Sequence, residues 1–409
     1  MSHPFDPIDL AAQEGPGLAE HLEAALHERI TEEEVQTDLG ELFRGAVKLT
    51  LEFMLEQVLR ETVGAAKWSK AKTRVDSYNG SYLRGLLTSM GHIQVRMPRA
   101  RKGGAPVDVI GAYQRRAAQV DDAITEAYVR GVSTRGMGDV VEALTGGSLG
   151  KSSVSRVTAR LEEEVEKLRT RSLEGSRYPY LYLDATYHKV RWARKVESVP
   201  ALIAYGVNHE GKRELLAIEI GTEESGTSWG NLLRGLLRRG LDGVLLVISD
   251  DHEGIKLAVK DHLPEVPHQR CVVHLMRNVG SYVPHRKGLR ERVLGQVSAI
   301  FQSEDLDQAK KLLTKFKERW TKELPEAVKC LEDGFAAASR FLAFPREHHA
   351  RIRSSNNLER LNREIKRRIR AVDSFPDRAS ALRLVTAVAV NAAGAWGRRR
   401  YLDMSLLAL

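Results

Sequence analysis

The chain contains 409 residues, enough to bury a sizeable core and to form two or three domains. Its formal net charge of +9 favours a polyanionic partner, because clustered lysine and arginine side chains gain affinity by releasing counterions from phosphates. Two cysteines, Cys271 and Cys330, are too few for a disulfide framework and are typical of the reducing cytoplasm.

The N-terminal region is expected to begin with a flexible lead-in. Residues 1–37 are acidic, contain Pro and Gly, and lack the basic segment and apolar run of a signal peptide. Apolar residues then recur at helical spacing across residues 38–63 and predict one amphipathic helix. Two β-prone runs on either side of residues 89–91 predict a β-hairpin.

Basic side chains at the exit of this hairpin are candidates for contact with DNA phosphates. They are Arg99, Arg101 and Lys102. A solvated loop accounts for them equally well, because connecting segments run over the protein surface.

A helix-turn-helix is the next expected feature. Residues 121–170 follow a pattern of helix, turn, helix, glycine-containing turn and helix. The last helix places Lys151, Arg156 and Arg160 near its start, where a recognition helix contacts bases and phosphates. Three-helix units also occur in proteins that never bind DNA, but the basic charge of the chain favours DNA binding here.

The hydrophobic pattern changes to that of β-strands after residue 176. Short runs rich in Tyr, Leu, Ile and Val predict four strands, at residues 178–190, 200–208, 213–221 and 243–250. A helical segment separates the third strand from the fourth, so we expect an α/β domain with a mixed sheet.

Helical spacing without further clear strands returns at about residue 275 and continues to residue 346. A helical insertion is therefore expected after the strands. The most apolar late stretch, residues 382–396, is short and contains Arg383 and Asn391, so we expect no membrane span.

Two of the predicted strands have an aspartate within or at their end. Asp184 lies within or at the end of the first strand, and Asp250 lies at the end of the fourth. A strand end can hold a catalytic ligand rigidly at the edge of a cleft. An acid in this place can equally open a turn or cap the next helix.

A third acid, Glu359, stands near the start of a strongly basic helix at residues 351–370. With Asn356 it has the spacing of a capping box, which would explain it without any function. The apolar residues of this helix form one stripe that would pack against a core, namely Leu358, Leu361, Ile365 and Ile369.

The three acids together indicate a ribonuclease H-like arrangement. Asp184 and Asp250 lie 66 residues apart, and Glu359 follows 109 residues later, as expected for a first strand, a fourth strand and a helix beyond an insertion. Phosphodiester transfer needs hard cations, and carboxylate oxygens suit Mg²⁺ and Mn²⁺. We therefore expect two Mg²⁺ or Mn²⁺ ions per active site.

Four stretches in this order, "LDATYHKVR", "SDDHEG", "QRCVVHLMRN" and "SSNNLERLNREIKRR", resemble the Mutator-type transposases of bacterial insertion sequences. The resemblance extends upstream to "NGSYLRGLLTSMGHIQVRMPRAR" and "YVRGVSTRGMGDVVEALTGG". It implies that Asp184, Asp250 and Glu359 form a catalytic DDE triad that binds the metals. "SDD" stands where the family usually has Ser-Asp-Gly or Ser-Asp-Ala, which leaves Asp251 as an alternative to Asp250.

The resemblance also implies that Cys271 and His274, a Cys-x-x-His element, shape the active site. Alone they supply two of the four ligands of a structural zinc site, so zinc is disfavoured. Trp320 could stack on DNA near the cleavage point, although a place in the core is favoured.

The function implied is that of a DNA transposase. It would bind terminal inverted repeats through its N-terminal domains, nick DNA by metal-dependent hydrolysis and join the 3′-hydroxyl ends to target DNA by transesterification. Basic residues of the last motif would position the DNA backbone. They are Arg360, Arg363, Lys366 and Arg367.

Two element ends must be processed together, so we expect a homodimer, in the bacterial cytoplasm and associated with the nucleoid. Two alternatives stay open: a non-catalytic DNA-binding protein derived from a transposase, and a ribonuclease H-fold nuclease or resolvase that cuts without joining. The N-terminal half is expected to comprise a lead-in (residues 1–37), a DNA-binding helix and hairpin (38–120) and a helix-turn-helix (121–175). The first part of the catalytic core (176–274), a helical insertion (275–350) and the C-terminal core helices (351–409) are expected to follow.

Overall fold

The computed structural model describes most of the chain. The described residues are 39–106, 109–111, 114–145, 153–154, 157, 161–193, 195–286, 288–370, 372–394 and 396–407. The chain divides into two compact units, Met1–Tyr128 with Thr134–Thr158 and Val129–Ser133 with Ala159–Leu409. Among the described helices, none has the length and apolarity needed to cross a membrane.

The first unit is built on a helix packed against a β-hairpin, as the sequence predicts. Its elements are α2 (Leu39–Val63), β1 (Tyr78–Thr88), β2 (Gly91–Ala100), α3 (Ala118–Val129) and α4 (Thr134–Thr145). The hairpin is antiparallel with Leu86 opposite Ile93. Leu55 of α2 packs with these two residues and with Val95 and Met97 in a buried cluster. The polar side chains of β2 alternate outward, because successive residues of a strand face opposite sides.

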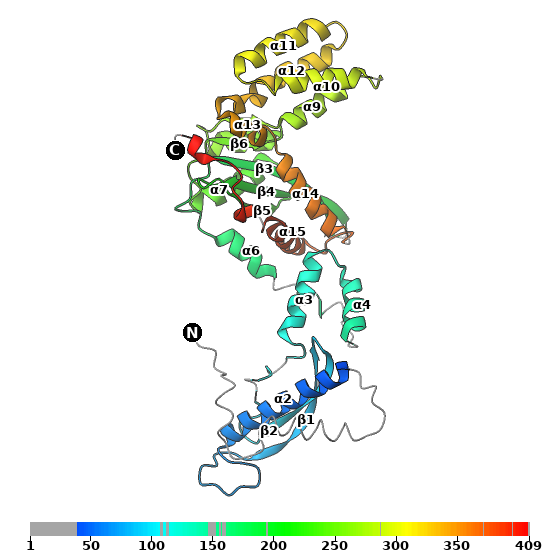
Figure 1. Cartoon of the computed structure of the whole chain (residues 1–409), viewed down its shortest axis with the longest axis vertical. Helices are drawn as coiled ribbons and strands as arrows, with labels where there is room; N and C mark the ends of the chain where they lie inside the picture. The colour runs from blue at the N-terminus through cyan, green and yellow to red at the C-terminus, as the bar shows by residue number, and fades with distance from the viewer. Residues whose placement is uncertain are drawn as a thin grey trace. The chain divides into compact units, whose positions relative to one another are not determined.

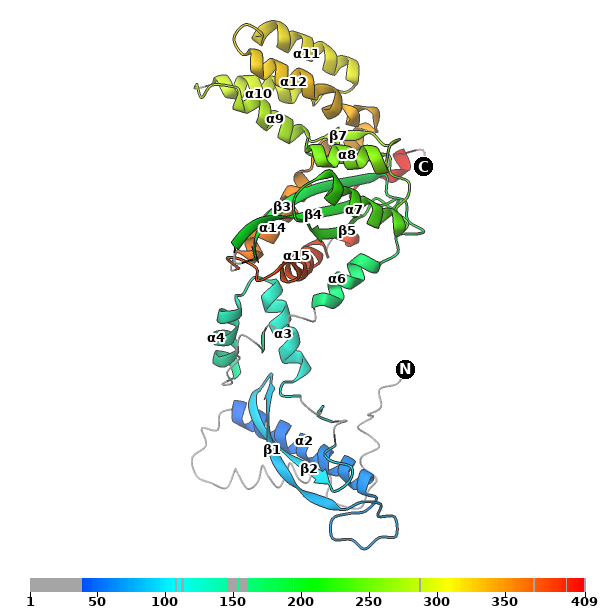
Figure 2. The same ribbon diagram turned by 180° about the vertical axis from the view of Figure 1, so that it is seen from behind.

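The second unit is built on a five-stranded mixed sheet with the order β5-β4-β3-β6-β7 (Figures 1 and 2). Strands β3, β4 and β5 are antiparallel neighbours, and β6 and β7 add in parallel on the other side of β3. Their bounds are β3 (Tyr180–Trp192), β4 (Lys195–Val207), β5 (Arg213–Ile220), β6 (Leu246–Ser249) and β7 (His268–Arg270). The four predicted strands are confirmed, whereas β7 was missed, because three residues are too short to show a period.

Helices cover both faces of the sheet (Figures 1 and 2). On one face lie α7 (Gly226–Arg238) and α8 (Glu253–His262), and on the other lie α14 (Asn356–Ile369) and α15 (Arg378–Ala393), with α6 (Leu161–Thr170) beside α15. The oxygen of Ser225 accepts a hydrogen bond from the backbone N–H of Ser228 and starts α7. Trp229, Leu232 and Leu236 then fall on one helical face, which explains why α7 packs on the sheet.

Helix α14 is fixed by the predicted apolar stripe, since Leu358, Leu361, Ile365 and Ile369 are all buried. The expected capping box is wrong. The N-cap is Ser355, and its side chain makes no capping hydrogen bond. Instead the backbone carbonyl of Ser355 accepts from the N–H groups of Leu358 and Glu359, so Asn356 already lies inside the helix.

The insertion between the strands and α14 is helical, as predicted. It comprises α9 (Val272–Ser281), α10 (Leu289–Ile300), α11 (Leu306–Trp320), α12 (Pro325–Ala338), a short 3₁₀ turn (Arg340–Ala343) and α13 (Arg346–Ile352). Trp320 is 1% exposed, and its indole N–H donates to Gln296 at 2.6 Å. The structure therefore places Trp320 in the core of the insertion and not on a DNA-facing surface.

Gly211 is expected to be sensitive to substitution. It has a φ of +78°, and a Cβ there would overlap the carbonyl oxygen of Leu402. Gly175, with a φ of +80° and open space around it, is the matched control. Each alanine substitution costs roughly 1–2 kcal/mol for the left-handed backbone, and Gly211→Ala should cost roughly 1–3 kcal/mol more for overpacking. Urea unfolding measures the difference, and equal losses at both glycines would contradict it.

Candidate active site

Asp184 stands on β3 with its side chain on the face covered by α14. Its Oδ1 accepts from the backbone N–H of Ala185 at 3.0 Å, and its Oδ2 accepts from Nδ2 of Asn362 at 2.8 Å. The residue is 8% exposed. Burial raises the pKa of Asp184 to about 7, and the negative charges of Asp250 and Glu359 contribute to the increase. The three predicted acids are therefore electrostatic neighbours in the folded chain.

Asp250 follows directly on β6, which runs parallel to β3, with Tyr182 opposite Ile248. Its Oδ1 accepts from the backbone N–H of His252 at 3.1 Å. The next residue, Asp251, forms ion pairs with basic side chains instead: its carboxylate lies 3.0 Å from Arg270 and 3.3 Å from Lys256. Asp250 is thus the acid that acts on Asp184, and Asp251 belongs to an ion-pair cluster.

Glu359 lies in the first turns of α14 and faces helix α9. Its Oε1 is 3.3 Å from Nε2 of His274 and 3.5 Å from Arg277. This oxygen is buried, and within the described part of the chain it accepts no hydrogen bond of good geometry. The Glu359 carboxylate is therefore held by charge and retains an unused acceptor.

Asn362 joins the site and was missed in the sequence. It follows Glu359 by three residues, so the two side chains occupy neighbouring positions on α14, and Asn362 is the one that reaches β3. Its Nδ2 is committed to Asp184, whereas its Oδ1 is buried without a hydrogen-bond partner among the described residues. The sequence signal for Asn362 is its spacing of three residues from Glu359 on the helix that was predicted to carry a metal ligand.

Cys271 and His274 connect the base of the insertion to α14. The buried Sγ of Cys271 accepts from the backbone N–H of Ser355 at 3.3 Å. Burial alone would raise the pKa of this thiol, but His274 and Ser355 outweigh it and lower the pKa. Cys271 in turn raises the pKa of His274, with Glu359 and Asp184 adding to the rise. The pair thus lies directly beside the acids.

The donor set fits a divalent cation by its chemistry. Asp184, Asp250 and Glu359 are hard oxygen donors whose mutual repulsion a cation would relieve, and Oε1 of Glu359 and Oδ1 of Asn362 are unused acceptors. Across the described ranges, however, no three His, Cys, Asp or Glu side chains are already arranged around one metal position. Asp184 and Asp250 accept hydrogen bonds from protein N–H groups, and Glu359 faces His274, so binding a cation requires side-chain rotation.

The predicted DNA contacts of α14 lie in the open. Arg360, Arg363, Lys366 and Arg367 are all exposed. Arg367 donates two hydrogen bonds of 2.8 Å to Glu364. Burial, with a smaller contribution from Lys366, lowers the pKa of His188 on β3 to about 4, which places Lys366 close to the strand that carries Asp184.

The predicted contacts of the first unit are only partly described. Arg99 is exposed, with its guanidinium 5.4 Å from the ring centre of Tyr82. Arg101 and Lys102 are exposed, and their backbone N–H groups donate to Ser77 and Asp76. Lys151, Arg156 and Arg160 lie outside the described residues.

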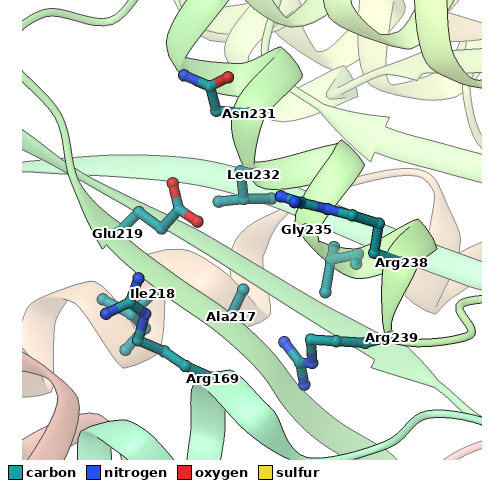
Figure 3. A pocket seen from close by; sticks show the side chains of 10 residues that line it. Arg169, Ala217, Ile218, Glu219, Asn231, Leu232, Gly235, Arg238 and Arg239 are labelled. Atoms are coloured by element: carbon teal, nitrogen blue, oxygen red, sulfur yellow. The ribbon is translucent and has the colours of Figure 1, made fainter.

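A hollow of ≈ 410 Å³ lies at the β5 edge of the sheet, two strands away from Asp184 (Figure 3). Glu219 and three arginines, Arg169, Arg238 and Arg239, surround it. Arg239 donates to the carbonyl of Leu216 at 2.8 Å and so covers the open edge of β5. This hollow therefore lies along the covered edge of β5 and is separate from the acid cluster.

One family model and several known proteins match most of the length of this chain. A family model described as "Transposase, Mutator family" matches residues 19–399. The chain is 37% identical over 362 residues to a Rhizobium meliloti transposase for insertion sequence element ISRM5, covering 88% of this chain and 90% of that protein. It is 38% identical to the IS406 transposase of Burkholderia multivorans, covering 82% and 86% of the two chains. It is 34% identical to the IS256 transposase of Staphylococcus aureus transposon Tn4001, covering 86% and 90%.

The raised pKa of Asp184 predicts a pH-dependent difference in stability for Asp184→Asn. The native state keeps the proton to about pH 7 while the unfolded chain loses it near pH 3.8, so wild-type stability falls as pH rises between these values. Asparagine carries no charge and still accepts from Asn362. In chelator, the variant should match the wild type below about pH 4 and exceed it by on the order of a few kcal/mol above about pH 7.

Urea unfolding at a series of pH values measures this difference. Parallel pH profiles of stability for the two proteins would show that the pKa of Asp184 is not raised in the folded state.

Proposed function

The chain belongs to the Mutator family of transposases, and from this premise we propose that it is the DDE-type transposase of an insertion sequence. The observation that supports the proposal is the convergence of Asp184, Asp250 and Glu359, which come from β3, the end of β6 and α14. The mixed sheet, with helices on both faces and a helical insertion before the glutamate, is compatible with a ribonuclease H-like core.

The three carboxylates would hold two Mg²⁺ or Mn²⁺ ions. When bound, such ions activate a water or a 3′-hydroxyl and stabilise the negative charge that develops at a phosphodiester. Asn362 keeps Asp184 in place through its hydrogen bond, and His274 and Arg277 hold Glu359 on the same side of α14.

The basic residues of α14 would bind the DNA backbone next to the acids. Arg363 and Lys366 follow Glu359 by four and seven residues and so lie on the same side of α14 as the glutamate. Both basic side chains are exposed, as is that of Arg360. They position the scissile phosphodiester without taking part in proton transfer. Water would attack a phosphodiester at the element end, freeing a 3′-hydroxyl and leaving a 5′-phosphate. That hydroxyl would then attack a phosphodiester of target DNA and displace the 3′-oxygen of the target strand. Neither step requires a covalent bond between protein and DNA.

The first unit would recognise the terminal inverted repeats. Its hairpin presents Arg99, Arg101 and Lys102 to solvent, which suits contact with phosphates. Because two element ends must be joined to one target, the active assembly is a homodimer in this proposal.

Glu359→Gln tests the assignment of the helix-borne acid. The variant loses the negative charge that would balance the cations, so nicking and strand transfer in Mg²⁺ should fall by orders of magnitude. Folding should survive, because among the described residues the buried Oε1 of Glu359 accepts no hydrogen bond that the substitution would remove, and the buried apolar stripe of α14 is unchanged. Glu364→Gln on the same helix is the matched control and should retain both reactions.

The readout is gel analysis of cut and joined strands from a duplex carrying the terminal repeats of its own element. Near wild-type nicking by Glu359→Gln would remove Glu359 from the site. Cutting without joined products by the wild type would instead indicate a nuclease or resolvase.

Asp250→Asn and Asp251→Asn should separate the two neighbouring acids. Asp250→Asn is expected to abolish nicking while leaving end binding intact. Asp251→Asn should keep the reaction but lower the melting temperature, because it leaves Arg270, whose side chain is only 10% exposed, without its ion-pair partner. Loss of nicking in Asp251→Asn with full activity in Asp250→Asn would reverse the assignment.

A further inference from the structure

The β3–β4 pair extends beyond the rest of the sheet as a two-stranded ribbon (Figure 2). The two strands pair along their whole length, from Tyr180 with Val207 to Trp192 with Lys195. Strand β6 pairs with β3 only as far as Tyr182, and β5 pairs with β4 only from Ala201 onward. The outer half of the ribbon, residues 187–193 and 195–200, therefore projects past its neighbours in the sheet.

The tip of this ribbon exposes a tryptophan. Trp192 is 53% exposed, and the guanidinium of Arg378, the first residue of α15, lies 4.8 Å from its ring centre. The ribbon is tied down just behind the tip, because Arg191 and Lys189 exchange backbone hydrogen bonds with Phe375 at 2.8 and 2.9 Å. The ring is thus displayed on a fixed support and not on a loose loop.

The charge around Trp192 is positive. On the outer half of the ribbon, Lys189, Arg191 and Lys195 outnumber the one described acid, Glu197. Arg378 adds a further positive charge over the ring. An exposed aromatic ring among cations is the combination that proteins use to bind a nucleic-acid strand, with stacking on a base and ion pairs to phosphates.

Trp192 also lies in line with the acid cluster. Asp184, Thr186, His188, Val190 and Trp192 alternate along the same face of β3, and α14 covers the first part of that face. Eight strand positions correspond to roughly 26 Å, which is about seven or eight nucleotides at 3.4 Å each. The basic side of α14 lies beside the same strand, as the proximity of Lys366 to His188 shows.

We infer that the tip of the β3–β4 ribbon is a further DNA-binding site, at which Trp192 stacks on a base extruded from the duplex about seven or eight nucleotides from the scissile phosphate. This inference rests on the proposed transposase function. It adds a contact that holds the DNA at a fixed distance from the acids, between the cationic ribbon and the exposed side of α14.

The test uses the full-length protein and a duplex carrying the terminal repeat of its own element. Trp192→Ala should weaken binding of this duplex by roughly 5- to 150-fold, the range for loss of one base–aromatic stack. Trp192→Phe should recover most of that loss. Val196→Ala is the matched control, because Val196 is 56% exposed on the opposite face of the same ribbon, and it should bind like the wild type.

A scan of single abasic sites locates the partner. Removing the stacked base should weaken the wild type at one position about seven or eight nucleotides from the cut, and should not weaken Trp192→Ala further. A 5-iodouracil placed at that position in the wild-type complex should crosslink to Trp192, which needs no variant if Trp192→Ala fails to fold.

Wild-type binding by Trp192→Ala, or crosslinks that avoid Trp192, would overturn the inference while leaving the proposed function intact. Dissociation of DNA-free Trp192→Ala into smaller species, measured by light scattering, would overturn it in favour of a contact between protein copies. A wild type that neither binds nor cuts the duplex would instead contradict the proposed function itself.

Discussion

The packing of α14 on β3 is the contact on which the acid cluster depends. Leu358, Leu361 and Ile365 are 0–3% exposed and fix both the position and the rotation of the helix. Burying each such side chain contributes roughly 1.5–3 kcal/mol, which offsets the cost of holding carboxylates close together. That cost is visible in Asp184, because burial and the neighbouring negative charges raise its pKa to about 7. The hydrogen bond from Asn362 then joins helix and strand at the acid itself.

A second set of bonds brings the late glutamate to the early strands. At the base of the insertion the N–H of Val272 donates to the carbonyl of Arg353 at 3.0 Å, and the N–H of Ser355 donates to Cys271. Buried Gln269 adds two bonds, donating to the carbonyl of Ala338 and accepting from the N–H of Phe341. The chain therefore leaves and re-enters the core at one place, and α14 starts beside α9. This geometry explains why His274 can reach Glu359 across so long a sequence separation.

The sequence predicted what local periodicity encodes. The four longer strands, the hairpin of the first unit, the helical insertion and the stripe of α14 all have clear periods, and the acids could be ordered along them. What escaped prediction depends on contacts between distant segments. Strand β7 is too short to show a pattern, Asn362 is defined by its partner 178 positions away, and Ser355 replaces Asn356 as the cap. The choice between Asp250 and Asp251 likewise required Arg270, which only the folded chain brings to Asp251.

The closed base of the insertion has a consequence for how this chain can vary in evolution. Because residues 272 and 353 are bonded to each other, the helices between them form a loop whose two ends are fixed independently of its length. Doubling the length of a flexible loop costs only about 0.6 kcal/mol in closure entropy. Lineages can therefore lengthen, shorten or replace this segment without altering the spacing of the three acids. Such changes are compatible with the fold as long as the bonds at the base of the insertion are kept.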